Sequence, residues 1–142
     1  TQQQNNLGSY TCGCHCGRIK YRFRCNAEEV TAWDCNCSDC YMRKNVHIII
    51  PRSQFGPPLM EEKEEDATTL YTWGTKRAKR RFCKTCGILP YYVPRSNPDG
   101  IGITLYCVLD FQENKPKVTI KQFDGVNWED NLEKSGIQNE SK

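Results

Sequence analysis

The feature that most constrains this chain is the spacing of its cysteines. There are 10 cysteines in 142 residues. Most of them fall into three tight groups: Cys14 with Cys16; Cys35, Cys37 and Cys40; and Cys83 with Cys86. Cysteines separated by one or two residues do not pair readily as unstrained disulfides, because the backbone between them must bend sharply. Their sulfurs can point at a common ion, so the grouping favours metal ligation.

Two of the groups match the pattern of a closed tetrahedral metal site. In an extended segment, residues i and i+2 lie on one face, which brings the sulfurs of Cys14 and Cys16 together. Cys83 and Cys86 are followed by Gly87, as in a zinc knuckle, where a small residue lets backbone N–H groups approach the thiolates. Together these pairs predict a structural four-cysteine zinc site that closes a long loop and stabilises the folded state.

The third group, CNCSDC at 35–40, offers three thiolates and no obvious fourth ligand. Three protein ligands leave zinc one position for water or a substrate atom, as catalytic zinc requires. An electron-rich three-thiolate site favours a soft ligand, such as a substrate thiolate, over hydroxide. A protein side chain in the fourth position would instead make this a second structural ion; the candidates are Asp39, His47, Cys12, Cys25 and Cys107. Outside that role, the last three are expected to be small buried hydrophobic residues.

The remaining pattern predicts one mainly β domain, an all-β fold with few short helices. Apolar and basic residues alternate from Ile19 to Arg24, which predicts the second strand of a hairpin over 10–25. Further strands are expected over 30–34, 46–50, 70–73, 101–109 and 118–123, with at most one helical turn in 61–66 and a short helix over 128–134. We expect a disordered N-terminal segment over 1–7, a single zinc-binding domain over 8–134 and a flexible tail over 135–142.

Charge and hydropathy limit the expected partners and location. The formal net charge of +3 is cancelled once the clustered thiolates bind two zinc ions, so composition gives little support for nucleic acid as a partner. The basic stretch 76–84 is dense enough for phosphate contacts, but a solvated hairpin paired with the acidic run 61–66 is favoured. The longest aliphatic run, 46–50, is too short to span a membrane. Clustered thiols without a visible signal sequence indicate a reducing compartment, the cytoplasm or nucleus.

Five motifs in order resemble a known family. They are CHCG at 14–17, CNCSDC at 35–40, FCKTCG at 82–87, PRSNPDG at 94–100 and FDGVNWE at 123–129. This order is similar to the glutathione-dependent formaldehyde-activating enzyme family, and within it to the centromere protein V branch. The resemblance covers about residues 8–129 and implies an Mss4-like β-tent of small antiparallel sheets held together by two zinc ions. It also implies that Cys14, Cys16, Cys83 and Cys86 hold the structural ion, and Cys35, Cys37 and Cys40 the catalytic one.

The reaction implied by the resemblance is the addition of the glutathione sulfur to formaldehyde, a carbon–sulfur lyase reaction in reverse. Asp39 and His47 are candidates for proton transfer, although a solvated Asp39 and a packed His47 are the competing interpretation. Arg95 is a candidate for binding a glutathione carboxylate. The alternative is a non-catalytic, zinc-stabilised interaction module of the centromere protein V type, acting in chromatin or cytoskeleton organisation.

Overall fold

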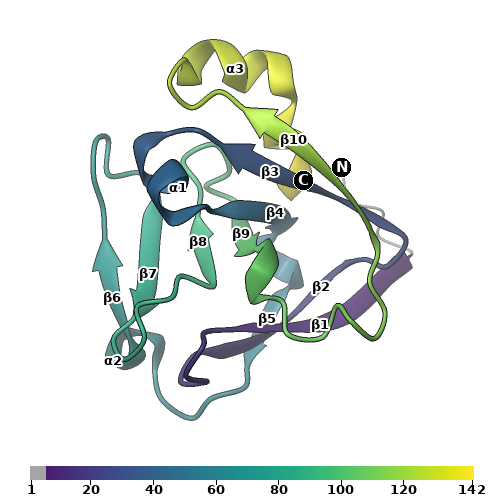
Figure 1. Cartoon of the computed structure of the whole chain (residues 1–142), viewed down its shortest axis with the longest axis vertical. Coiled ribbons are helices and arrows are strands. Elements are labelled where there is room, and N and C mark those ends of the chain that lie inside the picture. Colours follow the sequence, from purple (N-terminus) through teal and green to yellow (C-terminus); the bar gives the residue numbers. More distant parts are fainter. Residues whose placement is uncertain (1–5) are drawn as a thin grey trace.

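Two β-sheets build the fold of the computed structural model, which describes residues 6–142. The smaller sheet has the strand order β1-β2-β5, with β1 at Leu7–Gly13, β2 at Lys20–Asn26 and β5 at Phe55–Pro58. The larger sheet has the order β10-β3-β4-β9-β8-β7-β6 (Figure 1). Its strands are β3 (Glu29–Cys35), β4 (Val46–Pro51), β6 (Thr68–Tyr71), β7 (Lys79–Cys83), β8 (Tyr91–Val93), β9 (Gly100–Thr104) and β10 (Lys117–Phe123). Neighbouring strands are antiparallel except for the parallel pair β10 and β3.

Helices are short; most connect strands, whereas α3 and η4 follow the last strand. They are α1 (Ser38–Arg43), α2 (Glu64–Ala67) and α3 (Trp128–Ser135), with 3-10 turns η2 (Arg52–Gln54), η3 (Leu105–Cys107) and η4 (Ile137–Ser141). Helix α3 lies beyond β10 at one end of the molecule, far from the smaller sheet (Figure 1). The predicted fold class, mainly β with few short helices, is therefore confirmed.

An apolar core joins the two sheets. Tyr21 of β2 stacks on Phe55 of β5 with ring centroids 4.7 Å apart, and its edge meets Tyr91 of β8 at 5.1 Å. Strand β4 runs through the middle of the larger sheet, and its isoleucines at 48–50 are fully buried. β-Branched residues suit such a strand because they pack well on a pleated surface. Cys12 and Cys25 are also fully buried in this core, as expected for unliganded cysteines.

Local expectations hold to different degrees. The hairpin over 10–25 forms as β1 and β2, and the short C-terminal helix forms as α3. The strand expected over 101–109 ends at Thr104, where the chain turns into η3. The spacing of CNCSDC did not predict helix α1, which begins inside that motif. Residues 1–5 of the expected N-terminal segment lie outside the described residues, and Leu7 already belongs to β1.

Residues 135–142, expected to form a flexible tail, are placed against the rest of the domain. Residues of η4 pack against the larger sheet, with Ile137 and Ser141 buried. Buried Asn97 holds them, since its Nδ2 donates to the Ile137 carbonyl at 3.0 Å and to Ser141 Oγ at 2.8 Å. The tail lacks apolar periodicity, so its attachment depends on a polar residue 40 positions earlier.

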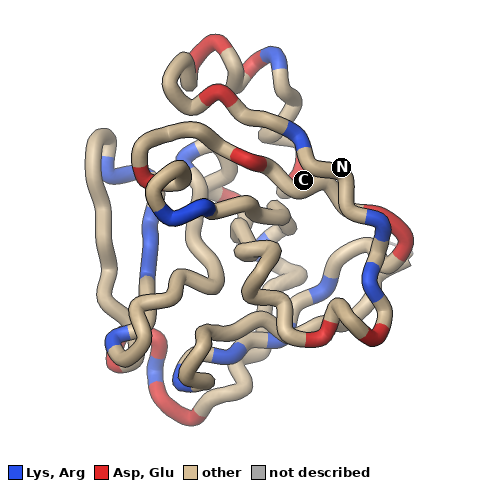
Figure 2. Tube along the Cα trace, in the orientation of Figure 1, with Lys and Arg blue, Asp and Glu red and all other residues tan. Residues whose placement is uncertain are grey.

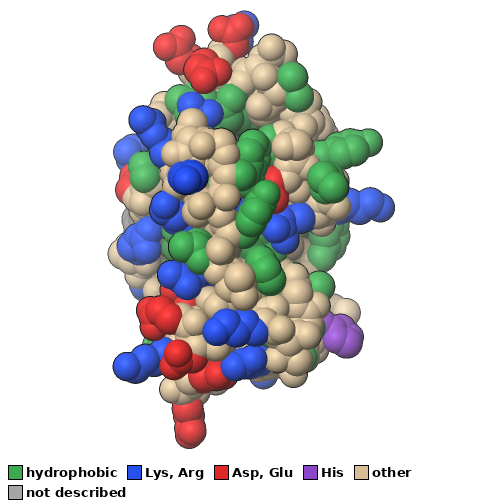
Figure 3. All heavy atoms as spheres, turned by 90° about the vertical axis from the view of Figure 1, so that its left-hand side faces the viewer, with side chains coloured by type: hydrophobic (Ala, Val, Ile, Leu, Met, Phe, Trp, Pro, Cys, Tyr) green, Lys and Arg blue, Asp and Glu red, His purple; other side chains and the backbone are tan. Residues whose placement is uncertain are grey.

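Charged groups of both signs are interspersed along the chain (Figure 2). The basic stretch 76–84 contains β7, which pairs with β6, and Arg81 lies 3.3 Å from Glu64 of the acidic run. On the face over this hairpin, hydrophobic and basic side chains are mixed, with acidic groups above and below them (Figure 3). The solvated-hairpin expectation fails at Arg80, which is buried. Among residues 6–142, no helix combines the length and apolar character needed to cross a bilayer.

Candidate metal centres and an adjoining pocket

The first cysteine cluster is a compact four-sulfur site. The sulfurs of Cys14, Cys16, Cys83 and Cys86 all lie within 4.8 Å of one another. The Cys14–Cys16 and Cys16–Cys83 sulfur distances are 3.6 and 3.5 Å. Four sulfurs at the usual Zn–S distance of about 2.3 Å would be about 3.8 Å apart in a tetrahedron. The cluster therefore has the donors and the size to hold a metal ion.

Two sharp turns form this cluster. Gly17 follows Cys16 with φ +83°, and Gly87 follows Cys86 with φ +77°, a region that glycine adopts without steric cost. The turns direct backbone N–H groups at sulfur: Ile19 N donates to Cys14 Sγ at 3.3 Å, and Thr85 N donates to Cys83 Sγ at 3.3 Å. Such donors stabilise thiolates, as the knuckle pattern predicted. Because one turn follows β1 and the other follows β7, the cluster joins the two sheets.

The second cluster forms where β3 passes into α1. Cys35 is the last residue of β3, and Cys37 caps α1, its sulfur accepting a hydrogen bond from Cys40 N at 3.4 Å. The three sulfurs, those of Cys35, Cys37 and Cys40, lie within 4.8 Å of one another, and over residues 6–142 no other His, Cys, Asp or Glu joins them. The side chains considered for a fourth ligand are therefore not part of the cluster. This trio has the donors for a metal with one position left for another molecule.

The thiols of the trio influence one another. Hydrogen bonds from Cys35 and Cys40, together with backbone N–H and the positive charge of Arg80, lower the pKa of Cys37 well below its usual range. The pKa of Cys35 is raised, mainly because its thiol donates to Cys37. These contacts favour the thiolate form of Cys37. Its thiolate gives the site a strong ligand for a soft metal at neutral pH.

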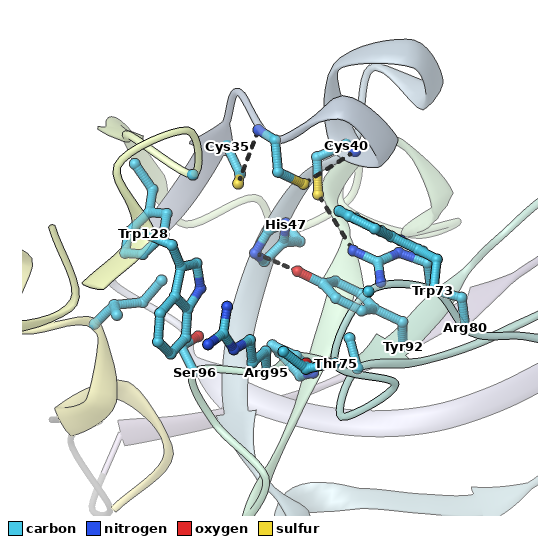
Figure 4. Close-up of a pocket in the computed structure, with 17 residues that line it drawn as sticks. Cys35, Cys40, His47, Trp73, Thr75, Arg80, Tyr92, Arg95, Ser96 and Trp128 are labelled. Atoms are coloured by element: carbon cyan, nitrogen blue, oxygen red, sulfur yellow. Dashed lines mark hydrogen bonds between the residues drawn. The ribbon is translucent and has the colours of Figure 1, made fainter. Parts of the chain in front are cut away.

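The trio borders a pocket with a cavity of about 220 Å³ (Figure 4). The turn between β6 and β7 forms one wall with Trp73, and the segment after β10 forms the other with Gly125 and Trp128. Gly125 lies against the cluster: a Cβ there would be 2.8 Å from Cys35 Sγ and from Cys37 Cβ. A residue with a side chain at position 125 would keep this segment from approaching the trio. This contact explains the glycine of the FDGVNWE motif.

Asp39 does not take the position expected of a proton donor. Its carboxylate lies 2.5 Å from Arg80 Nε and 3.0 Å from Arg43 Nε, and its side chain is only 9% exposed. It is not among the residues that line the pocket. The competing interpretation of a solvated Asp39 is also wrong, because this carboxylate is held between two guanidinium groups.

His47 lies in the pocket wall and is buried. Its Nε2 is 3.0 Å from the hydroxyl of Tyr92, and burial lowers the pKa of His47 to about 4. Burial also raises the pKa of Tyr92 well above its usual range, so this hydroxyl stays protonated and shares a hydrogen bond with the neutral imidazole. The packed interpretation of His47 is therefore correct, and His47 also borders the pocket.

Arg95 lies at the other side of the pocket. Its guanidinium stacks on the Trp128 ring at 3.6 Å from the centroid and lies 3.4 Å from the exposed carboxylate of Glu129. The structure places Arg95 and the trio in the lining of the same pocket, about 60 residues apart in sequence. Cation–π stacking fixes the plane of the guanidinium while leaving its edge free for polar contacts.

Sequence reasoning missed Arg80. This side chain, 5% exposed, approaches the trio with Nη2 3.9 Å from Cys40 Sγ. It lies between two rings, 5.7 Å from the centroid of Trp73 and 4.9 Å from that of Tyr92 (Figure 4). Alternation along strand β7 divides its basic residues between two faces, but this pattern does not reveal that one face meets a cysteine cluster.

Comparison with known proteins agrees with this arrangement. The family model of the glutathione-dependent formaldehyde-activating enzyme matches residues 9–123. A crystal structure of a Rhodobacter sphaeroides protein superposes with a TM-score of 0.58 at 27% identity, covering 77% of this chain and 99% of that one. The family match includes both cysteine clusters and the strands that carry them. This chain belongs to the glutathione-dependent formaldehyde-activating enzyme family.

Proposed function

We propose that this protein is a zinc enzyme of the carbon–sulfur lyase type that adds the sulfur of glutathione, or of another small thiol, to formaldehyde. The observation that carries the proposal is the trio of Cys35, Cys37 and Cys40 at a pocket, with no fourth side-chain ligand among residues 6–142. A closed four-ligand site would have no position for a substrate. The family match supports glutathione and formaldehyde as the reactants.

The donor chemistry supports zinc as the metal of both clusters, two ions per chain. Sites built only from thiolates select soft or borderline ions, and tetrahedral sulfur sites are typical of zinc. The four-cysteine cluster would be structural, because its ligands are complete and it joins the two sheets. Bound to the trio, zinc would supply a Lewis acid that lowers the pKa of a substrate thiol and holds it as thiolate.

The side chains of the pocket would bind and orient the reactants. Arg95 offers a guanidinium edge for a glutathione carboxylate, a pairing that is frequently bidentate. Trp73 and Trp128 form apolar walls that exclude water from the reacting atoms. Of the two candidates for proton transfer, Asp39 is held by Arg43 and Arg80 away from the pocket. His47 lines the pocket, and it would pass a proton only through its hydrogen bond with Tyr92, which lines the same pocket.

The reaction is an addition without oxidation or reduction. The thiolate sulfur donates an electron pair to the carbonyl carbon, and a carbon–sulfur bond forms. The π electrons of the carbonyl move to oxygen, and this oxygen takes up one proton, equivalent to the proton that the thiol released on ionising, to give S-hydroxymethylglutathione. Holding both reactants in one pocket supplies the orientation that separate molecules lack in water.

NMR exchange spectroscopy tests the proposal. The addition also proceeds without a catalyst, so the test must compare the exchange rate with protein to the uncatalysed rate. We expect the zinc-loaded protein to accelerate exchange between glutathione and its ¹³C-formaldehyde adduct, measured by NMR, and Cys37→Ser to abolish the acceleration. Cys107→Ser removes a thiol outside both clusters and should behave like the wild type. A wild-type rate equal to the uncatalysed rate would contradict the proposal. That result would favour the non-catalytic interaction module instead. Two further expectations stay predictions: that the protein belongs to the centromere protein V branch, and that it is located in the cytoplasm or nucleus.

A further inference from the structure

We propose that Arg80 is a catalytic residue that binds the oxygen of the carbonyl substrate and stabilises the negative charge that develops on it. This inference rests on the proposed function, since it assigns a role within the same pocket. The observation behind it is a buried guanidinium that borders both the pocket and the thiol trio, with Nη2 3.9 Å from Cys40 Sγ.

The guanidinium of Arg80 is held in one orientation. Asp39 contacts Nε at 2.5 Å from helix α1, the helix that also carries Cys40. The rings of Trp73 and Tyr92 lie 5.7 and 4.9 Å from its central carbon (Figure 4). A donor fixed before the reaction begins needs no reorganisation when charge appears, and this is the condition for effective electrostatic catalysis.

The other polar groups of the pocket are less suited to this task. Arg95 is 27% exposed and stacked on Trp128, in reach of Glu129. His47 carries no charge at neutral pH, and its Nε2 is occupied by the Tyr92 hydroxyl. Among the residues that line the pocket, Arg80 is therefore the buried cation next to the trio.

The position of Arg80 fits the chemistry of the addition. As sulfur bonds to the carbonyl carbon, the π pair moves to oxygen and makes an alkoxide beside the thiolates. Charge-assisted N–H···O⁻ hydrogen bonds are shorter and stronger than those between neutral groups, and burial of the Arg80 guanidinium strengthens them further. The proton that completes the hydroxymethyl group then arrives at an oxygen already held by Arg80.

Kinetics of position-80 variants test this role against a purely structural one. We expect Arg80→Gln to lower the turnover above background by roughly 100-fold, while its metal content stays as in the wild type. With cobalt substituted for zinc, we expect glutathione to change the absorption spectrum of the wild type through sulfur ligation, and this change should also persist in Arg80→Gln. Arg80→Lys, which keeps the charge, should recover part of the rate. Arg81→Gln is the matched control, because Arg81 is the next residue and pairs with Glu64 outside the pocket. Turnover of Arg80→Gln within threefold of the wild type, or loss of metal and glutathione binding together with turnover, would overturn the assignment.

A binding measurement on the wild-type protein tests the same role without an activity assay and without any substitution. Formate carries a negative oxygen on a single carbon, so we expect it to shift the Arg80 Nε–H and Trp73 indole NMR signals of the glutathione-saturated, zinc-loaded wild type. Unchanged Arg80 signals under formate would overturn the oxygen site. If the wild type shows no acceleration but formate does shift Arg80, the proposed function fails and the oxygen site stands.

Discussion

Asp39 and Arg80 form an ion pair with 2.5 Å between Oδ2 and Nε, and this pair ties helix α1 to strand β7. Their side chains are only 9% and 5% exposed, so neither charge is well solvated. Asp39 also contacts Arg43, one helical turn away, but that arginine is 28% exposed. Asp39 therefore matters more for the charge of Arg80, which is buried, than for the charge of Arg43, which water can solvate.

Replacing the buried carboxylate should destabilise the protein markedly. We expect Asp39→Asn to lower the free energy of unfolding by about 3 kcal/mol, because Arg80 would remain buried without a counter-charge. Urea unfolding of the metal-loaded protein measures this. Arg43→Gln removes the more exposed partner and should cost only about 0.5 kcal/mol. Equal losses in the two variants would show that burial of the pair does not matter.

A methyl group at position 125 should weaken metal binding at the trio. The added Cβ of Gly125→Ala would lie 2.8 Å from Cys35 Sγ and 2.9 Å from Cys37 N, both too close without movement. We expect the affinity of the trio for zinc to fall about 10- to 100-fold, as when the surroundings of ligands are disturbed. Competition with a chromophoric chelator measures the affinity. Val126→Ala, at an adjacent residue that is 73% exposed, serves as the control and should bind zinc normally.

His47 should make stability depend on pH in mildly acidic solution. An unfolded histidine takes up a proton below about pH 6.5, whereas burial lowers the pKa of folded His47 to about 4. Between these values the unfolded state binds the extra proton, so the free energy of unfolding falls as pH decreases, by up to about 1.4 kcal/mol per pH unit. Comparing wild type with His47→Gln from pH 6.5 to 5 isolates this effect, because metal release in acid is common to both. Identical pH dependence would mean that His47 titrates normally.

The two clusters should lose metal in a fixed order. We expect about two zinc ions per chain, with the trio releasing its ion to a chelator first because three thiolates bind less tightly than four. Cys37→Ser should keep one ion and the native circular dichroism spectrum. In contrast, Cys83→Ser should unfold or strongly destabilise the domain, since the four-cysteine cluster joins the sheets. A single tightly held ion, or the opposite response of the variants, would refute the assignment of the sites.

The sequence predicted local elements well where the pattern is local. Strand alternation located β2, the β-branched run located β4, and cysteine spacing separated the two clusters correctly. The sequence did not reveal helix α1, because the helix has only six residues and begins inside the CNCSDC motif, where the cysteine spacing masks any helical periodicity. The attachment of η4 was missed because it depends on hydrogen bonds from Asn97, which no periodicity reveals.

The pocket was harder to predict than the clusters, because its residues are distant in sequence. Arg95 was named and lines the pocket, whereas Arg80 was assigned to solvent with the rest of the basic stretch. Arg80 pairs in register with Tyr92 across β7 and β8, and Tyr92 contacts His47 from β4. Such contacts depend on the order of the strands in the sheet, and this order cannot be predicted from the residue pattern of a single sequence.

Strand β7 begins next to Arg80 and ends at Cys83, so one five-residue strand connects the pocket with the four-cysteine cluster. Any loosening of the four-sulfur site would free the end of this strand and with it the guanidinium three residues earlier. A metal ion in the closed cluster, remote from the pocket, would thus set how firmly one wall of that pocket is held, and refilling the trio alone would not restore the wall while the closed cluster stays empty.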